Sequence, residues 1–143
     1  MQILKVQNIG KVYGSRKSPK QYMALKNISF GVNEGEFIGV MGASGSGKTT
    51  LLNILGSIDK PTTGRFIMDG RDIVDLHKDQ LAKHRVKNIG FIFQDYNLLE
   101  TMTLKENVIL PLALSGYKAQ VMDSKVSGLA KDLGIGGILD KYP

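Results

Sequence analysis

The chain has 143 residues, of which 42% are hydrophobic, enough for one ordinary domain with its own core. Its 19 Lys and Arg against 13 Asp and Glu give a net charge of +6, which favours anionic partners such as nucleotides, nucleic acid or an acidic membrane surface. Without cysteine, a disulfide framework and a thiolate metal site are excluded. There is no signal-peptide layout and no apolar run of the roughly 20 residues that cross a bilayer, so we expect a cytosolic chain that does not itself span a membrane.

Strands dominate the first part of the predicted fold. Residues 3–14 and 23–33 are short, rich in β-branched residues and partly alternating, which predicts two strands. The nearly continuous apolar stretch Phe37–Met41 predicts a third, of the kind buried on both faces of a parallel sheet. It runs into the glycine-rich stretch Gly42–Thr50. A helix is predicted after that stretch from a broad apolar face made by Leu51, Leu52, Ile54, Leu55 and Ile58.

Helices and turns dominate the second part. The dipeptide Asp69-Gly70 favours a tight hairpin turn. Residues 76–86 predict a basic, moderately amphipathic helix, and residues 88–93 predict another apolar strand. A final helical stripe, which ends at the glycines of residues 134–137, consists of Met122, Val126, Leu129, Ala130 and Leu133.

Another helix is predicted from Thr103 to Leu114. Thr103 is a suitable N-cap, and Glu106 three residues later completes a capping box. We expect Pro111 to kink or end this helix, because proline lacks the N–H that an interior helical residue donates.

The glycine-rich stretch fits the phosphate-binding pattern G-x-x-x-x-G-K-[ST] through Gly42, Gly47, Lys48 and Thr49. Glycines let backbone N–H groups turn toward a bulky anion, and the start of the following helix faces the same anion with its unpaired N–H groups. Lys48 would supply a positive charge at the β- and γ-phosphates, and Thr49 a hydroxyl for Mg²⁺. The remaining loop residues expected to contact the nucleotide are Ala43, Ser44, Gly45, Ser46 and Thr50.

Hydrolysis of a nucleotide also needs a carboxylate near the metal and a group that orients water. Asp69 ends an apolar stretch, but a hairpin turn explains it better than a metal role. Gln94, at the tip of the apolar stretch 88–93, is a better candidate, because an amide can accept from metal-bound water and donate to a phosphate. The alternative is a loop glutamine that faces solvent.

Aromatic and histidine side chains offer weaker signals. Tyr13 and Tyr22 could each stack on a nucleotide base, although most tyrosines are half-buried packing residues. His77 and His84 lie on the basic helix with no acidic or cysteine ligands near them, so we expect a solvated face rather than a metal site. The same helix lacks the interleaved aromatic residues that nucleic-acid binding would favour.

Three stretches in order, residues 11–14, 42–55 and 90–108, resemble the ATP-binding subunit of an ATP-binding cassette (ABC) transporter. The resemblance covers the whole chain and is closest to the bacterial branch of macrolide exporters, lipoprotein-release ATPases and bacitracin-type peptide resistance transporters. It implies ATP and Mg²⁺ as cofactors, Tyr13 as the aromatic that stacks on adenine, and Lys48 and Gln94 in catalysis. Gln94 would join Thr49 at the metal and lie where membrane subunits dock. It assigns no role to Tyr22.

The implied fold is α/β, a P-loop NTPase-type sheet with an antiparallel β subdomain, in which residues 1–143 form the amino-terminal portion of one ATP-binding domain. The implied partners are transmembrane permease subunits and a second ATP-binding subunit, at the cytoplasmic face of the cell membrane, and not nucleic acid. We expect an incomplete domain, because the LSGGQ signature and the strand with the Asp-Glu pair of this family do not occur in the chain. It would then bind ATP without hydrolysing it alone, and be of low stability or self-associate.

Other readings share the phosphate-binding loop. A GTPase is disfavoured because no N-K-x-D guanine-reading motif occurs. A small-molecule kinase remains open, whereas a DNA-repair cassette ATPase would need long heptad helices that are not present. A pure nucleotide-binding module is the behaviour that we expect of the 143 residues themselves.

Overall fold

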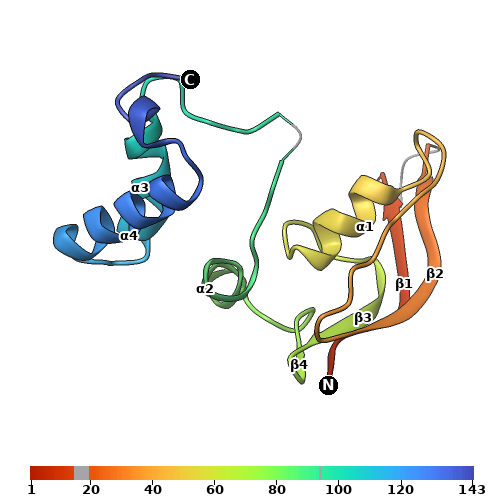
Figure 1. Ribbon diagram of the computed structural model, residues 1–143. Coiled ribbons are helices and arrows are strands. Elements are labelled where there is room, and N and C mark those ends of the chain that lie inside the picture. The colour runs from red at the N-terminus through yellow and green to blue at the C-terminus, as the bar shows by residue number, and fades with distance from the viewer. Residues whose placement is uncertain (15–19, 94) are drawn as a thin grey trace. The chain divides into compact units, whose positions relative to one another are not determined.

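The computed structural model describes residues 1–14, 20–93 and 95–143 (Figure 1). These residues form two compact units, Met1–Ile89 and Gly90–Pro143. None of the helices in the described ranges is both long and apolar enough to cross a membrane.

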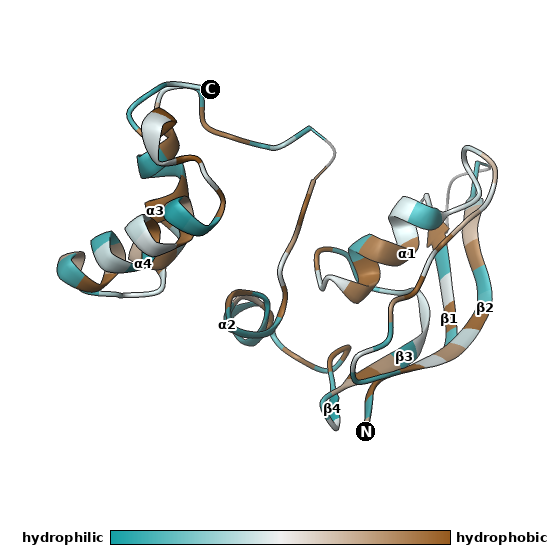
Figure 2. Ribbon diagram, viewed as in Figure 1, coloured by the Kyte–Doolittle hydropathy of each residue, from teal (hydrophilic) through white to brown (hydrophobic). Residues whose placement is uncertain are grey.

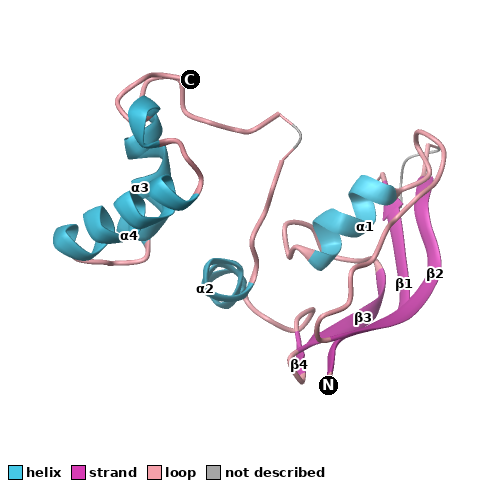
Figure 3. Ribbon diagram, viewed as in Figure 1, coloured by secondary structure: helices cyan, strands magenta, loops and turns pink. Residues whose placement is uncertain are grey.

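The first unit contains an antiparallel four-stranded sheet with the strand order β2-β1-β3-β4 (Figure 3). Its strands are β1 (Gln2–Tyr13), β2 (Tyr22–Asn33), β3 (Thr63–Met68) and β4 (Arg71–Asp72). The two long strands pair from end to end, with Gln2 opposite Asn33 and Tyr13 opposite Tyr22. This sheet confirms the first two predicted strands and the antiparallel β subdomain.

The hairpin predicted at Asp69-Gly70 is confirmed. Met68 pairs with Arg71, so Asp69 and Gly70 alone form the loop between β3 and β4. Asp69 has φ 47° and Gly70 has φ 76°. A two-residue turn with both φ values positive matches the right-handed twist of the strands, and Asp and Gly tolerate that conformation better than most residues.

Helices α1 (Lys48–Leu55) and α2 (Lys78–Asn88) complete the first unit. Leu51 and Ile54 of α1 are buried in the same core cluster as residues of the sheet, so the helix that follows the glycine-rich loop is fixed to the strands. Leu81 attaches α2 to the same cluster. The core consists of Val6, Ile9, Leu25, Leu51, Ile54, Phe66, Ile73, Leu76 and Leu81.

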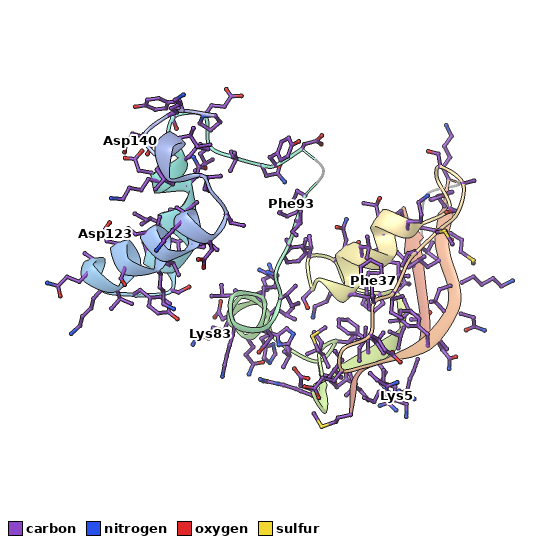
Figure 4. All side chains as sticks on the ribbon, in the orientation of Figure 1. Lys5, Phe37, Lys83, Phe93, Asp123 and Asp140 are labelled. Carbon is purple, nitrogen blue, oxygen red and sulfur yellow. The ribbon has the colours of Figure 1, made fainter. Side chains whose placement is uncertain are left out.

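The strands predicted over Phe37–Met41 and 88–93 are absent from the structure, and both predictions are wrong for the chain as it stands. α2 continues through Asn88, and neither residues 37–41 nor residues 89–93 pair with a strand. Phe37 is 97% exposed, on the segment between β2 and α1 (Figure 4). Figure 2 shows hydrophobic colour along the segment that follows α2. An apolar stretch forms a strand only where a neighbouring strand supplies hydrogen bonds, and each described strand pairs only with its neighbours in the order β2-β1-β3-β4.

The second unit consists of α3 (Leu104–Leu114), α4 (Ala119–Asp132) and the short 3₁₀ helix η1 (Gly136–Ile138). The predicted capping box is confirmed: the Glu106 N–H donates to Thr103 Oγ1 over 3.2 Å, and the Thr103 N–H donates to Glu106 Oε2 over 2.7 Å. The Glu106 carboxylate also accepts from the Thr103 hydroxyl over 2.9 Å, and the bonds from the Thr103 N–H and hydroxyl hold the pKa of Glu106 below its usual value. Pro111 does not end the helix, which continues for three further residues.

Candidate functional site

The glycine-rich loop leads directly into α1, and its backbone depends on glycine at two places. Gly47 is the N-cap of α1 with φ 93°, and a Cβ added there would lie 2.5 Å from the Ala24 carbonyl oxygen of β2. Gly45 has φ 79°, a left-handed conformation that other residues adopt only with strain. The sequence therefore predicts both the place of the loop and the reason for its composition.

Lys48, the first residue of α1, folds its side chain back over the loop. Its ammonium group donates to the carbonyl oxygens of Gly42 and Ala43, each over 2.8 Å. The positive charge expected at a bound phosphate is thus held at the loop itself, at the end of α1 where unpaired backbone N–H groups and the helix dipole also favour an anion.

A cavity of about 280 Å³ opens beside this loop. Its lining includes the ammonium-bearing Lys48, the hydroxyl-bearing residues Ser44, Thr49 and Thr50, and the glycines Gly45 and Gly47. Cationic and hydroxyl donors around a glycine-rich backbone are the groups that bind phosphate oxygens, and a threonine hydroxyl is an oxygen ligand of the type that Mg²⁺ prefers. The residues present therefore fit a nucleotide polyphosphate with its magnesium ion.

Tyr22 also lines this cavity, together with Ala24 of the same strand. The Tyr22 hydroxyl donates to the Gly45 carbonyl oxygen over 3.0 Å. The sequence offered Tyr22 only as a general aromatic candidate, and the contact with the loop was missed. Its signal was the pairing of the two strands, which places Tyr22 opposite Tyr13 at the end of the hairpin nearest the loop.

Tyr13 lies in a different set of contacts. Its hydroxyl donates to Asp59 Oδ2 over 3.0 Å, and the Lys11 ammonium lies 2.6 Å from Asp59 Oδ1 and 4.9 Å from the centre of the Tyr13 ring. Burial raises the pKa of Asp59, but the hydrogen bonds from Lys11 and Tyr13 outweigh it, so that the pKa lies below its usual value. Tyr13 keeps a partly exposed ring, as a base-stacking residue requires, but it is not among the residues that line the cavity.

The remaining candidates for metal binding and catalysis are Gln94 and Asp69. Gln94 lies outside the described residues. Asp69 forms the hairpin turn, as expected. Within residues 1–14, 20–93 and 95–143, no three His, Cys, Asp or Glu side chains come together as metal ligands. Thr49 is therefore the predicted metal-contacting residue that the structure places at the cavity.

The expectation that both histidines lie on a solvated face is wrong for His84. His77 is exposed, but His84 is only 7% exposed, and its Nδ1 lies 2.9 Å from Nδ2 of Asn88. His84 follows the core residue Leu81 by three positions, which puts both on the same face of α2. Burial lowers the pKa of His84, and the positive charge of Arg71 acts in the same direction against a smaller opposite effect of Asp69.

Taken together, a left-handed glycine at the N-cap, the Lys48-Thr49 pair that begins a helix and a hydroxyl-lined cavity define a protein of the phosphate-binding-loop class. Residues 25–143 match the family described as ABC transporter, and the chain belongs to this family. This confirms the resemblance and the cassette fold, and favours them over a kinase or another NTPase with the same loop.

Several relatives support the closer placement. The chain is 48% identical over 143 residues to the bacitracin export ATP-binding protein BceA of Halalkalibacterium halodurans, covering all of this chain and 56% of BceA. It is 43% identical over 145 residues to the macrolide export ATP-binding/permease protein MacB of Syntrophobacter fumaroxidans, covering 20% of that longer protein. The chain therefore spans about half the length of relatives such as BceA.

A solved structure agrees in fold. The ATP-binding cassette MJ0796, in a dimeric post-hydrolysis state bound to ADP and Pi, superposes with a TM-score of 0.87 at 36% sequence identity. The match covers 99% of this chain and 62% of MJ0796.

Proposed function

We propose that residues 1–143 bind ATP with Mg²⁺, as the phosphate-binding portion of an ATP-binding domain. The observation that carries the proposal is the Lys48 ammonium held over a glycine-rich loop beside a cavity lined with hydroxyl groups. Lys48 would contact the β- and γ-phosphates, Thr49 the magnesium ion, and the loop amides the remaining phosphate oxygens. Tyr13 would stack on adenine, and Gln94 would reach the metal in the complete site.

The whole protein would act as the ATP-binding subunit of an exporter. Supporting this, BceA is named for bacitracin export and MacB for macrolide export. MacB is also named as a fused ATP-binding and permease protein, and the MJ0796 structure is dimeric. We therefore propose a second copy and a membrane permease as partners, and a place at the cytoplasmic face of the cell membrane. The proposed cargo is a peptide, an antibiotic or a lipophilic molecule.

Binding and turnover are separate expectations. Hydrolysis needs a carboxylate that works with the metal-bound nucleotide, and the Asp-Glu strand and LSGGQ stretch of this family do not occur in the 143 residues. We expect this stretch to bind ATP and to leave it intact, so that no phosphate is released above the rate in buffer alone.

The decisive experiment compares Lys48→Ala with Lys83→Ala by titration of Mg-ATP in calorimetry. Both variants lose one positive charge, but Lys83 is an exposed residue of α2 and does not belong to the phosphate-binding loop. A charge-assisted contact to phosphate predicts affinity about tenfold or more weaker for Lys48→Ala, with Lys83→Ala like the parent chain. Absence of ATP binding by the parent chain, or equal loss in both variants, would refute the proposal. Magnesium-dependent hydrolysis abolished by Lys48→Ala would instead refute the expectation of binding without turnover.

A further inference from the structure

Tyr22 connects the end of the sheet to the phosphate-binding loop. It is the first residue of β2, and its side chain is 57% exposed, so burial in the core does not explain where it lies. Its hydroxyl donates to the Gly45 carbonyl oxygen over 3.0 Å, and its side chain forms part of the cavity beside Lys48. The strand and the loop are 23 residues apart in sequence at this contact.

The contact fixes one peptide group of the loop from both sides. The carbonyl of Gly45 and the N–H of Ser46 belong to the same planar peptide unit, in which they point in opposite directions. The carbonyl accepts from Tyr22, and the Ser46 N–H donates to the Ala43 carbonyl oxygen over 3.2 Å. A peptide unit held at both ends cannot rotate without breaking a hydrogen bond, although glycine itself would permit the rotation.

The strand that carries Tyr22 is itself firmly placed. Leu25, three residues along β2, is buried in the core cluster with Leu51 and Ile54 of α1. A Cβ added at Gly47 would lie 2.5 Å from the Ala24 carbonyl oxygen and 2.9 Å from Leu25 Cδ2, so β2 lies directly against the start of α1. The Tyr22 hydroxyl therefore belongs to a strand that is packed both in the core and against the start of α1.

We propose that Tyr22 is a positioning residue of the phosphate-binding loop, which holds the Gly45–Ser46 peptide in place before a polyphosphate arrives. The proposal rests on the proposed nucleotide binding and names a residue to which the family resemblance gives no role. A loop that is already ordered loses less conformational freedom when it binds its ligand, so the affinity is higher. Tyr13 and Tyr22 then have different tasks, because the Tyr13 hydroxyl is bound to Asp59 and not to the loop.

The first test measures the affinity of the 143-residue chain for inorganic tripolyphosphate and for Mg-ATP. Tyr22→Phe keeps the ring and removes the hydroxyl, and Tyr117→Phe makes the same change on an exposed tyrosine of the second unit. Loss of one loop hydrogen bond predicts about twofold to tenfold weaker binding of both ligands to Tyr22→Phe and no change for Tyr117→Phe. Unchanged or tighter binding overturns the proposal. Weaker binding of ATP alone also overturns it, because that result indicates a contact with the base.

The second test needs no ligand, so it separates this proposal from the proposed function. We expect the loop amides of residues 44–47 to exchange their hydrogens faster in Tyr22→Phe than in the parent chain, while amides of β1 and β3 exchange at equal rates in both. Equal exchange at the loop overturns the positioning role whether or not ATP binds. Failure of the parent chain to bind ATP, with faster loop exchange in Tyr22→Phe, refutes the proposed function and leaves the positioning role intact.

Discussion

Strand β2 and the segment Phe37–Met41 are separated by only three residues and are both rich in apolar side chains, yet they have opposite structures. β2 pairs along its length with β1, and Leu25 on it is buried in the core. The segment Phe37–Met41 forms no strand, and Phe37 is almost completely exposed. The difference teaches that hydrophobic composition indicates a strand, whereas a partner within reach decides whether one forms.

The distance to the partner explains the contrast. β2 follows β1 after a short connection, and an antiparallel partner can follow directly along the chain. A strand buried inside a parallel sheet has a neighbour on each side, and each neighbour is joined to it only through a long crossover connection. The described residues offer Phe37–Met41 no such neighbour, and its apolar side chains remain in contact with water.

The largest effect is expected when the same substitution, phenylalanine to alanine, is made once in the core and once in the exposed segment. Phe66 of β3 is 2% exposed within the core, so Phe66→Ala should lower the free energy of unfolding by about 3–5 kcal/mol, which is enough to unfold a marginal unit. Phe37→Ala removes the same atoms from an exposed position and should change it by less than about 0.5 kcal/mol. Urea unfolding followed by circular dichroism measures both. Similar losses would mean that Phe37 is packed in solution.

A smaller effect concerns self-association. Exposed, unpaired apolar segments favour pairing with another chain, so we expect the parent chain to show concentration-dependent association in sedimentation velocity. The double variant Phe37→Glu, Ile92→Glu places a charge in each of the two segments and should weaken association about tenfold or more.

The matched control for this measurement is Val86→Glu. It introduces the same charge at an exposed apolar residue of α2, outside both segments, and should leave the association as it is. A parent chain that stays monomeric and melts cooperatively at all concentrations would contradict the prediction, as would equal effects of all three substitutions.

The smallest expected effect is a pH dependence of the free energy of unfolding, which comes from His84 on α2. Burial holds the pKa of His84 below the ordinary value of about 6.5 in the folded chain, so below pH 6.5 the unfolded chain binds a proton that the folded chain does not. The contribution of neutral His84 to the free energy of unfolding is therefore fully present above pH 6.5. It decreases as the pH falls, by up to about 1 kcal/mol between pH 7 and 5.5. His84→Asn should reduce this slope, and His77→Asn, at the other histidine, should preserve it. Equal slopes in all three chains would show that the pKa of His84 is not lowered in the folded state.

The features that could be predicted from the sequence depend on groups close together in the chain. The capping box joins Thr103 to Glu106, the Asp69-Gly70 turn needs two adjacent residues, and the phosphate-binding loop needs a run of glycines next to a helix. In each case the hydrogen bonds or the backbone conformation are determined within a few residues. Family resemblance added the cassette fold, which no short-range pattern supplies.

The features that could not be predicted depend on contacts across the fold. Tyr22 meets Gly45 only because β1 and β2 pair in one register and α1 is packed on the same core. His84 is buried because α2 turns the face with Leu81 toward that core, although its neighbours in sequence are mostly charged. The strand predicted at Phe37–Met41 failed for the opposite reason, since its long-range contacts are missing among the described residues.

The way in which Lys48 binds its own loop has a consequence for selectivity. With two backbone carbonyls as acceptors, the ammonium group is already solvated by the protein, so an incoming anion must displace these carbonyls and gains only the difference in bond strength. A weak, singly charged anion such as chloride gains little from that exchange, whereas the densely charged end of a triphosphate gains a great deal. Competition with these two carbonyls would thus favour polyphosphates over weak, singly charged anions at Lys48.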